Sequence, residues 1–462
     1  MNKPLAKPAV HATVERLRAA FASGRTRPAA WRRAQLCALE AMLTVHEAEF
    51  AAALKADLGK SASEATLTEI GYLRGEARRT RRHLAKWMRP RRVPTPLFAQ
   101  PGRARLVAEP LGVALIMAPW NYPLLLALSP LIGAIAAGNC AAVKPSEVAP
   151  HAAAVIAKHL PEHLDGDAVA VIEGGVETAT ALLAERWDKI FYTGNAAVGR
   201  IVMAAAAEHL TPVTLELGGK SPCIVLEDAA LDVAARRIAW GKFLNAGQTC
   251  VAPDYVLVAR GREAALLEAL ARAIADFYGP DPAASGDFAR IVNGRHFERL
   301  LPLLAEGEAV TGGTSDAATR YIAPTVLTGV AADGAAMREE IFGPILPVLP
   351  VQGLDEAIAF VNARPKPLAL YLFSESGGAA DRVVAETSAG GMAVNETVLH
   401  LAVPGLPFGG VGESGMGAYH GRYSFRAFSH EKAVLRRRSW PDARLRYPPI
   451  TRRKLGLMKR FL

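Results

Sequence analysis

A cysteine in a polar loop is the first side chain whose type and position suggest chemistry. Cys250 lies in the glycine-containing segment 245–253, between a predicted helix and a predicted strand. A thiolate is a strong nucleophile, and loops carry functional residues more often than the elements they connect. Cys250 is therefore a candidate covalent nucleophile, and a small packing residue is the alternative interpretation.

A glutamate at the end of an apolar strand is the second candidate. Glu216 precedes two glycines, which allow close backbone approach, and a carboxylate desolvated at such a turn has a raised pKa and can act as a general base. An exposed strand end, or an ion pair with Lys220, is the alternative interpretation. Residues 218–221 also resemble a phosphate-binding loop, but Thr214 replaces its first glycine, which excludes that motif.

An asparagine clamped between two prolines is the third candidate. Asn121 lies between Pro119 and Pro123 directly after a predicted strand, so its amide is held in place and could donate to a developing oxyanion. An ordinary turn-forming role is the alternative. Tyr122 and Trp240 could line an apolar substrate tunnel beside these groups, and core packing explains them equally well.

Three residues occupy a turn suited to phosphate binding. Gly194, Asn195 and Gly199 lie where the predicted strand 189–192 gives way to a helix, and backbone amides at a helix N-terminus bind phosphate. A simple helix N-cap is the alternative. A literal Gly-x-Gly-x-x-Gly occurs at 410–415, but no strand precedes it and no βαβ unit follows, so we exclude it as a dinucleotide site.

The other cysteines are Cys37, Cys140 and Cys223, which lie in apolar runs, and we expect them to be small buried hydrophobic residues. No Cys-x-x-Cys pair is present, and no histidine pair lies near a cysteine to complete a zinc site. We therefore expect neither a disulfide framework nor a metal in the reaction.

The elements that must position these groups alternate in a βαβ pattern, which predicts an α/β protein with parallel sheets. Residues 14–88 read as two or three helices, and a Pro-rich stretch at 90–101 ends them. A second α/β unit follows a boundary near Thr214. Strands are predicted at 113–117, 141–143, 168–172, 189–192, 223–226, 255–259, 368–373 and 392–394, with helices at 231–243 and 264–277.

Length and composition limit the class of protein. The 462 residues suffice for two or three domains, and 51% hydrophobic with 21% charged residues is typical of a folded globular chain. The uncharged run 111–143 is interrupted by prolines and asparagines, so we expect buried core rather than a membrane span. The N-terminus lacks the apolar core of a secretory signal, from which we expect a cytoplasmic protein.

The formal net charge of +10 is concentrated in two segments. Residues 74–92 contain nine Lys or Arg against one acidic residue, and residues 436–462 contain ten against one. Solvated helix faces explain most such runs, and we expect no nucleic-acid partner. The apolar, basic end of the chain would also suit peripheral contact with an anionic surface, as an accessory or non-catalytic role, but it is too short to span a membrane.

Taken together, the motifs resemble those of the aldehyde dehydrogenase superfamily. Segments 119–123, 215–222 and 247–250 look like three family signatures in the family's order, and 137–139, 144–147, 191–195, 339–344 and 365–374 also match. The segments 191–195, 406–417 and 418–421 resemble the class 3 branch, which includes fatty-aldehyde, aromatic-aldehyde and coniferyl-aldehyde dehydrogenases.

The resemblance implies a mechanism that agrees with the chemistry of the individual residues. Cys250 would attack the aldehyde, Asn121 and the Cys250 amide would hold the oxyanion, and Glu216 would activate the water that hydrolyses the thioester. For the cofactor, it assigns Lys144 and Glu147 to the adenosine ribose. A carboxylate there favours NAD, and NADP is a second option.

The remaining implications concern the nicotinamide and the architecture. Glu340 and Phe342 look like the family's contacts to the nicotinamide ribose and ring, although an exposed Glu and a core Phe are the alternatives. The class 3 branch suggests a homodimer. The resemblance implies two α/β domains. The N-terminal helices and an NAD(P)-binding domain of modified Rossmann type occupy 1–92 and 113–214, and a catalytic domain occupies 215–396. It also implies a small β-rich oligomerisation arm, made of the bridging segments 93–112 and 397–440, and a basic tail at 441–462.

Overall fold

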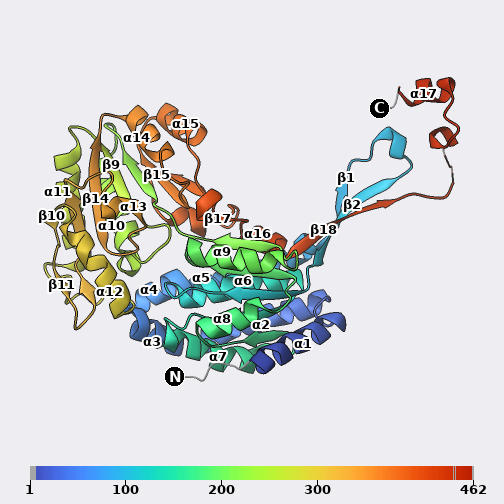
Figure 1. Cartoon of the computed structure of the whole chain (residues 1–462), viewed down its shortest axis with the longest axis horizontal. Coiled ribbons are helices and arrows are strands. Elements are labelled where there is room, and N and C mark those ends of the chain that lie inside the picture. Colours follow the sequence, from blue (N-terminus) through green and yellow to red (C-terminus); the bar gives the residue numbers. More distant parts are fainter. Residues whose placement is uncertain (1–6, 441, 443, 460–462) are drawn as a thin grey trace.

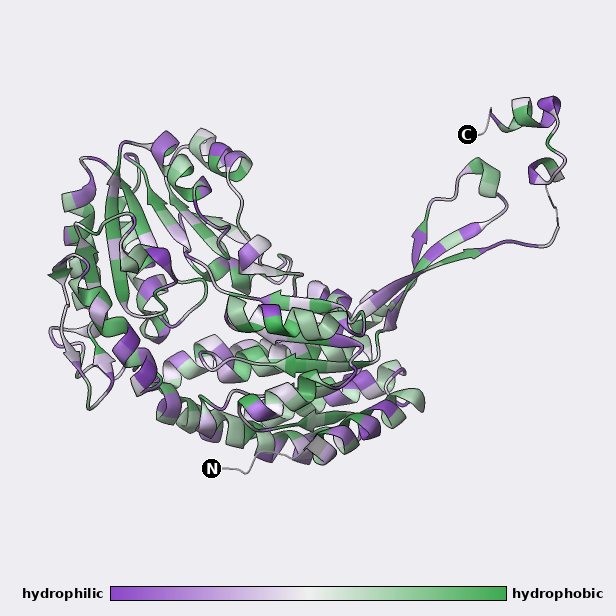
Figure 2. Cartoon of the chain, in the orientation of Figure 1, coloured by the Kyte–Doolittle hydropathy of each residue, from purple (hydrophilic) through white to green (hydrophobic). Residues whose placement is uncertain are grey.

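The computed structural model describes residues 7–440, 442 and 444–459, and it confirms the predicted α/β class (Figure 1). Two mostly parallel sheets form the cores of two units, and a three-stranded arm extends away from both. Figure 2 shows that the strands of both sheets are predominantly hydrophobic, whereas polar residues lie on the outer faces of the helices. Such continuous apolar strands are expected when helices cover both faces of a parallel sheet.

The N-terminal segment contains more helices than the two or three predicted. The junction between the second and third helices is His46 alone, and Gly59 ends the third helix in a left-handed conformation with φ of 70°. Neither break carries a proline, which is why the helical pattern looked continuous. The helices are α1 (Lys7–Ala22), α2 (Ala29–Val45), α3 (Glu47–Leu58), α4 (Ala62–Ala65) and α5 (Gly71–Met88), with a π-helical turn at Thr66–Ile70.

The first sheet has the strand order β17-β7-β6-β3-β4-β5 and is parallel except for β17. Its strands are β3 (Val113–Met117), β4 (Cys140–Lys144), β5 (Val169–Val171), β6 (Lys189–Thr193), β7 (Val213–Glu216) and β17 (Gly415–Met416). Its helices are α6 (Pro123–Ala137), α7 (Pro150–His163), α8 (Val176–Leu183), α9 (Ala196–Ala207) and α16 (Arg422–Ala427).

The uncharged run 111–143 forms β3, α6 and β4, whose side chains are almost all buried. Among the described residues no helix is long and apolar enough to cross a membrane. The prediction of buried core is therefore confirmed.

The second sheet has the order β10-β13-β14-β9-β8-β15-β16, with only β10 antiparallel. Its strands are β8 (Pro222–Val225), β9 (Tyr255–Ala259), β10 (Glu308–Thr311), β13 (Thr325–Thr328), β14 (Ile345–Val351), β15 (Ala369–Phe373) and β16 (Gly391–Val394). Its helices are α10 (Leu231–Phe243), α11 (Glu263–Tyr278), α12 (Gly294–Leu300), α13 (Ala335–Arg338), α14 (Leu354–Asn362) and α15 (Gly377–Glu386), and β11 (Ser315–Asp316) and β12 (Tyr321–Ile322) form a hairpin.

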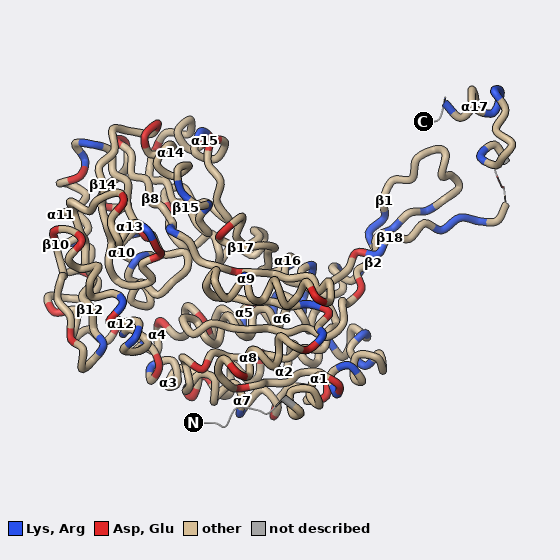
Figure 3. Tube along the Cα trace, in the orientation of Figure 1, with Lys and Arg blue, Asp and Glu red and all other residues tan. Residues whose placement is uncertain are grey.

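The arm consists of β1 (Arg91–Val93), β2 (Arg103–Pro110) and β18 (Ser429–Arg436), paired antiparallel in that order. Beyond it lies α17 (Arg452–Met458). Figure 3 shows Lys and Arg gathered on the arm strands and on the segment that follows them. On α5, by contrast, Arg74 pairs with Glu47, and Arg78 pairs with Glu40. Part of the positive charge of 74–92 is therefore neutralised within the fold.

The observed strand pairing differs from two of the domain boundaries expected from the sequence. The division between 214 and 215 falls inside β7, which belongs wholly to the first sheet, so we place it in the turn after Glu216. Segment 397–440 is not only a bridge, because β17 pairs with β7 and α16 packs on α6. Both shifts depend on contacts between distant parts of the chain.

A buried ion pair joins the N-terminal helices to the first sheet. Lys60 Nζ lies 2.7 Å from Glu69 Oε1, and both side chains are fully buried. The other carboxylate oxygen accepts hydrogen bonds from the amides of Leu124 and Leu125 in the first turn of α6, and Lys60 donates to the Asn121 carbonyl. This pair therefore connects the helix that follows Asn121 to the outer helices.

We predict that Glu69→Gln lowers the free energy of unfolding by about 3–5 kcal/mol, because Lys60 then remains buried without a counter-charge. In a Lys60→Met background the same substitution should cost much less, because it then removes a buried carboxylate that has already lost its counter-charge. Denaturant unfolding of all four proteins measures this difference. An equal cost of Glu69→Gln in both backgrounds would contradict the predicted coupling.

Candidate active site

The three predicted reactive residues meet in the region between the two sheets. Asn121 follows β3 and Glu216 ends β7, so both lie at the carboxyl edge of the first sheet, while Cys250 lies in the turn before β9 of the second. The Asn121 amide donates to the Gln248 carbonyl at 3.1 Å, two residues from the cysteine. Burial and the charge of Glu340 raise the pKa of Cys250, and the charge of Glu216 raises it further, so Glu216 lies within electrostatic range of the thiol.

The backbone before the cysteine turn adopts an unusual conformation. Asn245, Ala246 and Gly247 have φ angles of 53°, 52° and 74°, which lie in the left-handed region. A Cβ on Gly247 would lie 2.2 Å from the Gly343 carbonyl oxygen, so only glycine fits there. Strained backbone of this kind persists only where surrounding contacts hold it, and it is concentrated at functional sites.

Glu216 is a buried carboxyl group with no counter-ion. Its side chain is 2% exposed, neither carboxylate oxygen has a hydrogen-bond partner among the described residues, and burial raises its pKa well above the usual range. The alternative of an ion pair with Lys220 is wrong, because that lysine pairs with Asp254 at 2.5 Å. A carboxyl group in such surroundings is suited to proton transfer rather than to structure.

The environment of Cys250 disfavours its thiolate. Burial is the largest cause of its raised pKa, and the nearby carboxylates of Glu340 and Glu216 raise it further. A thiol in these surroundings needs a proton acceptor before it can attack.

The three other cysteines lie outside this site. Cys140 and Cys223 are buried as predicted, whereas Cys37 is exposed on α2, so the prediction for Cys37 was wrong. An apolar neighbourhood in sequence does not fix which face of a helix a residue occupies.

A second acidic group lies against the glycine turn after Glu216. A Cβ on Gly218 would lie only 1.9 Å from the Glu340 carboxylate, so the glycine leaves room for that group. Burial, with a contribution from Asp254, raises the pKa of Glu340 to about 8. Phe342 has a φ of 51°, and its ring packs edge-on against Trp120 with 5.3 Å between ring centroids.

The predicted adenosine and phosphate residues lie at the same edge of the first sheet. Lys144 ends β4 and its ammonium lies 2.9 Å from the Glu147 carboxylate. Asn195 caps α9 by accepting a hydrogen bond from the Val198 amide. Crevices outside the carboxyl ends of parallel strands are where α/β proteins bind nucleotides, and an anion at the N-terminus of α9 would be favoured by the helix dipole.

The two predicted glycines of that turn make close contacts. A Cβ on Gly194 would lie 2.2 Å from the Tyr192 hydroxyl, and one on Gly199 would lie 2.9 Å from Leu217. The donor set of amides, an ammonium and a half-exposed carboxylate therefore fits a dinucleotide. A carboxylate can accept from ribose hydroxyls, and the amides can donate to phosphate.

The wall of a largely apolar cavity of about 270 Å³ includes Cys250, Tyr122 and Trp240. The Tyr122 hydroxyl is hydrogen-bonded to Thr249 at 2.7 Å. Sequence reasoning missed the rest of the lining, most of which comes from elements far from Cys250 in the chain, although Thr249 and Val251 flank it. The remaining lining residues are Leu67, Thr68, Tyr72, Leu125, Leu126, Leu244, Thr249, Val251, Val398, Leu399, Leu401, Ala402, Phe408, Tyr419 and His420.

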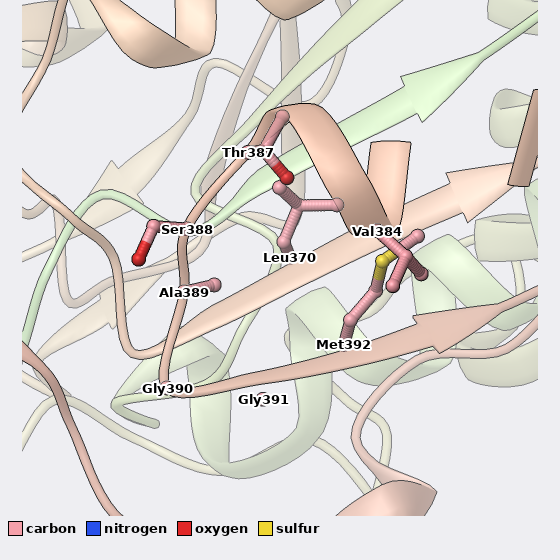
Figure 4. Close-up of a pocket in the computed structure, with 8 residues that line it drawn as sticks. All are labelled: Leu370, Val384, Thr387, Ser388, Ala389, Gly390, Gly391 and Met392. Carbon is pink, nitrogen blue, oxygen red and sulfur yellow. The ribbon is translucent and has the colours of Figure 1, made fainter. Parts of the chain in front are cut away.

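A second cavity, of about 310 Å³, lies at the edge strand β16 and is lined by none of the predicted site residues (Figure 4). Its wall is formed by Leu370, Met392 and the end of α15 with the segment that follows.

The Gly-x-Gly-x-x-Gly motif at 410–415, excluded above as a dinucleotide site, forms a turn. Its Gly415 pairs with Glu216, so its role here is structural.

Two mostly parallel sheets with functional side chains at their carboxyl edges are typical of α/β enzymes that bind nucleotides. Residues 4–434 match the model of the aldehyde dehydrogenase family. The chain therefore belongs to the aldehyde dehydrogenase family, and it is an NAD(P)-dependent oxidoreductase that acts on aldehydes.

Several relatives cover nearly the whole chain. Mouse aldehyde dehydrogenase family 3 member A2 is 50% identical over 97% of this chain and 93% of its own length. The dog aldehyde dehydrogenase described as dimeric and NADP-preferring is 49% identical over 94% of this chain and 97% of its own length. A structure described as the substrate-bound state of Staphylococcus aureus AldH is 46% identical, covers both chains fully, and superposes with a TM-score of 0.96.

We predict that Glu216→Gln makes the protein more stable than the parent as pH rises. Below the unfolded-state pKa the carboxyl group is neutral in both states, so the two proteins should unfold alike. Above that pKa, Glu216 ionises in the unfolded chain, whereas in the folded protein burial raises its pKa and it stays neutral. The parent therefore loses stability as pH rises, and Glu216→Gln, which has no group to ionise there, does not. Thermal unfolding between pH 5 and 9 measures this, and a constant difference in midpoint across that range would contradict it.

Proposed function

We propose that this enzyme oxidises apolar or aromatic aldehydes to carboxylates through a covalent intermediate on Cys250. The observation that carries the proposal is a partly buried thiol in the wall of an apolar cavity, near a buried carboxyl group that lacks a hydrogen-bond partner among the described residues. The thiol supplies the nucleophile, and the carboxyl group supplies the base for hydrolysis.

In the first step Cys250 loses its thiol proton to solvent water, and its Sγ attacks the carbonyl carbon. The Asn121 amide and the Cys250 backbone amide would donate to the oxyanion of the tetrahedral thiohemiacetal. In this structure the Asn121 amide donates to the Gln248 carbonyl, so it is already aimed at the cysteine turn. Loss of one such donor typically lowers the rate by about 100 to 1000-fold.

When bound, NAD(P) would supply the acceptor for the hydride that leaves the thiohemiacetal carbon. Lys144 and Glu147 would hold the adenosine ribose. The turn at Gly194, Asn195 and Gly199 would hold the pyrophosphate, and the side chains of Glu340 and Phe342 would contact the nicotinamide ribose and ring. We propose that the enzyme prefers NAD, because the Glu147 carboxylate would repel the 2′-phosphate of NADP. We also propose that it accepts NADP, because Lys144 partly neutralises that carboxylate.

In the last step Glu216 takes a proton from the water that attacks the thioester, which releases the carboxylate and restores the thiol. Because burial raises the pKa of Glu216, the base form increases with pH, and hydrolysis should become faster toward alkaline pH.

The cavity favours an apolar substrate. Aromatic rings and aliphatic side chains form most of its wall, and Leu67 and Leu399 at its lining are exposed to solvent. Such a wall suits a coniferyl-type or benzyl-type aromatic aldehyde and also a fatty aldehyde, which is the alternative substrate.

A panel of aliphatic, benzyl and cinnamyl aldehydes with NAD or NADP tests the function through nicotinamide absorbance. We expect turnover with at least one aldehyde, none in Cys250→Ala, and unchanged turnover in Cys37→Ala, since Cys37 is exposed and lies outside the site. Glu216→Gln should give a burst of one equivalent and then little turnover. Undiminished turnover in Cys250→Ala, or no burst in Glu216→Gln, would contradict the proposed roles.

We also propose that two copies associate through the arm. The outer strands β1 and β18 have open edges, as does β16 of the second sheet, and open strand edges readily pair with another chain. Phe98 and Leu435 on the arm are large apolar side chains with more than half of their surface exposed. The relative from dog is itself described as dimeric.

We predict that a Phe98→Asp/Leu435→Asp variant shifts the mass in solution toward the 49.1 kDa of one chain, because charges at the interface oppose association. Light scattering after size exclusion measures this mass. Val176→Asp, which changes an exposed apolar residue on the first unit, is the matched control and should leave the mass unchanged. The proposed interface would be wrong if the arm variant and the control behaved alike.

Peripheral contact with an anionic membrane surface is a second proposed property, favoured by α17. This helix is basic, and its Leu455 and Leu457 are exposed. Basic helices with exposed apolar side chains bind anionic interfaces without spanning them. Surface binding by the basic segments would accompany catalysis and would not replace it, since the chain is an aldehyde dehydrogenase.

A further inference from the structure

The cavity that contains Cys250 has a polar corner in its largely apolar wall. Tyr72 on α5, Leu401 in the 3₁₀ helix Leu399–Ala402 and His420, just before α16, all line this cavity. The Tyr72 hydroxyl and the His420 ring both hydrogen-bond to the Leu401 carbonyl, and these three groups form the polar corner. The proposed reaction steps use none of them, so the corner concerns which substrate is recognised.

The hydrogen bonds of the polar corner determine the tautomer of His420. Its Nδ1 lies 2.9 Å from the Leu401 carbonyl oxygen, and a carbonyl only accepts, so we assign the ring hydrogen to Nδ1. The Tyr72 hydroxyl donates to the same oxygen at 3.4 Å. Burial lowers the pKa of His420 to about 4, so the ring is neutral near neutral pH and Nε2 keeps its lone pair.

His420 Nε2 is a hydrogen-bond acceptor that has no donor in the described part of the chain. The His420 side chain is buried, with 4% of the residue exposed, and its ring bonds involve Nδ1 alone. Buried polar atoms are normally hydrogen-bonded, and an unsatisfied one costs free energy. Because His420 forms part of the cavity wall, a molecule in the cavity can supply the donor.

The His420 ring is held in one orientation. Phe408 stacks on it with 5.1 Å between ring centroids and 14° between the ring planes, and Tyr419 packs edge-on at 4.3 Å. The His420 backbone has a φ of 76°, in the left-handed region, and its amide donates to Ser424 Oγ at 2.9 Å. An acceptor fixed in this way loses little conformational freedom when a donor binds to it.

The groups around the polar corner favour an aromatic ligand. Phe408, Tyr419 and Tyr72 all have their rings within 6 Å of the His420 ring, and aromatic side chains pack well on aromatic rings. Tyr419 also connects the corner to the reactive group. Burial raises its pKa, and the charges of Cys250 and Tyr72 are among those that raise it further, so it lies within electrostatic range of both.

We propose that the enzyme prefers phenolic aldehydes, and that His420 determines this specificity by accepting a hydrogen bond from the distal hydroxyl group at Nε2. The inference rests on the proposed function, because it concerns the same cavity, and it selects aromatic over fatty aldehydes there. A phenol satisfies Nε2, whereas an aldehyde without a hydroxyl group displaces water from the corner and leaves Nε2 unpaired. Sites that hydrogen-bond a substrate hydroxyl reject the analogue that lacks it for this reason.

Steady-state kinetics with two matched pairs of aldehydes test the proposal: 4-hydroxycinnamaldehyde against cinnamaldehyde, and 4-hydroxybenzaldehyde against benzaldehyde. We expect kcat/KM of the parent to be about tenfold or more higher for the phenolic member of at least one pair. His420→Phe keeps an aromatic ring beside Phe408 but removes the acceptor. It should abolish that preference by raising KM for the phenolic aldehyde, with kcat and the values for its partner little changed. His209→Phe makes the same change at an exposed histidine outside the cavity and should keep the preference.

Calorimetric binding of the corresponding alcohols to the parent protein needs neither turnover nor a variant that folds. We expect 4-hydroxycinnamyl or 4-hydroxybenzyl alcohol to bind about tenfold more tightly than the alcohol without the phenol group. Turnover of none of the four aldehydes would count against the proposed function, whereas the alcohols test the polar corner by itself. Equal binding within both pairs of alcohols, or an unchanged preference in His420→Phe that is folded by circular dichroism, would overturn the inference.

Discussion

The left-handed backbone at Asn245–Gly247 is the constraint on which the position of Cys250 depends. The Asn245 amide donates to Glu64 at 2.8 Å, and its side chain donates to the Asn121 carbonyl, also at 2.8 Å. Gln248 in turn bonds back to the Asn245 carbonyl and to the Arg290 carbonyl. The strained turn is therefore held by the N-terminal helices, the first sheet and the second unit together, and the thiol reaches its position only when all three have assembled.

The same contacts explain why the reactive groups are so strongly perturbed. Glu216 is buried and Cys250 and Glu340 are partly buried, and desolvation is the main cause of the raised pKa of each. Neutral carboxyl groups near a neutral thiol avoid the repulsion that three adjacent anions would produce. The positive charge of the chain lies mainly on the arm and beyond it, away from this chemistry (Figure 3).

Much of the fold could be predicted from sequence because its central strands are buried runs bounded by helices of fitting length. The helix Leu231–Phe243 and the strands Val113–Met117 and Tyr255–Ala259 begin and end where the pattern placed them. The reactive residues stood out because each follows or precedes a strand end. The break at His46 did not, because it carries neither proline nor glycine. The Lys60–Glu69 pair did not either, because its burial depends on α6 packing against the turn that carries Glu69. The arm was implied by the family resemblance alone, since the pairing of β2 with β18 joins segments far apart in the chain.

The central claim is that the acyl group of the substrate is carried by Cys250 and released by Glu216. Intact-protein mass spectrometry of Glu216→Gln, after incubation with NAD and an aldehyde that the parent oxidises, tests it most directly. We predict a mass increase equal to the aldehyde less two hydrogen atoms, located by peptide mapping on the fragment that contains Cys250. An unmodified protein after hydride release, or an adduct on Cys37, Cys140 or Cys223 instead, would contradict the claim.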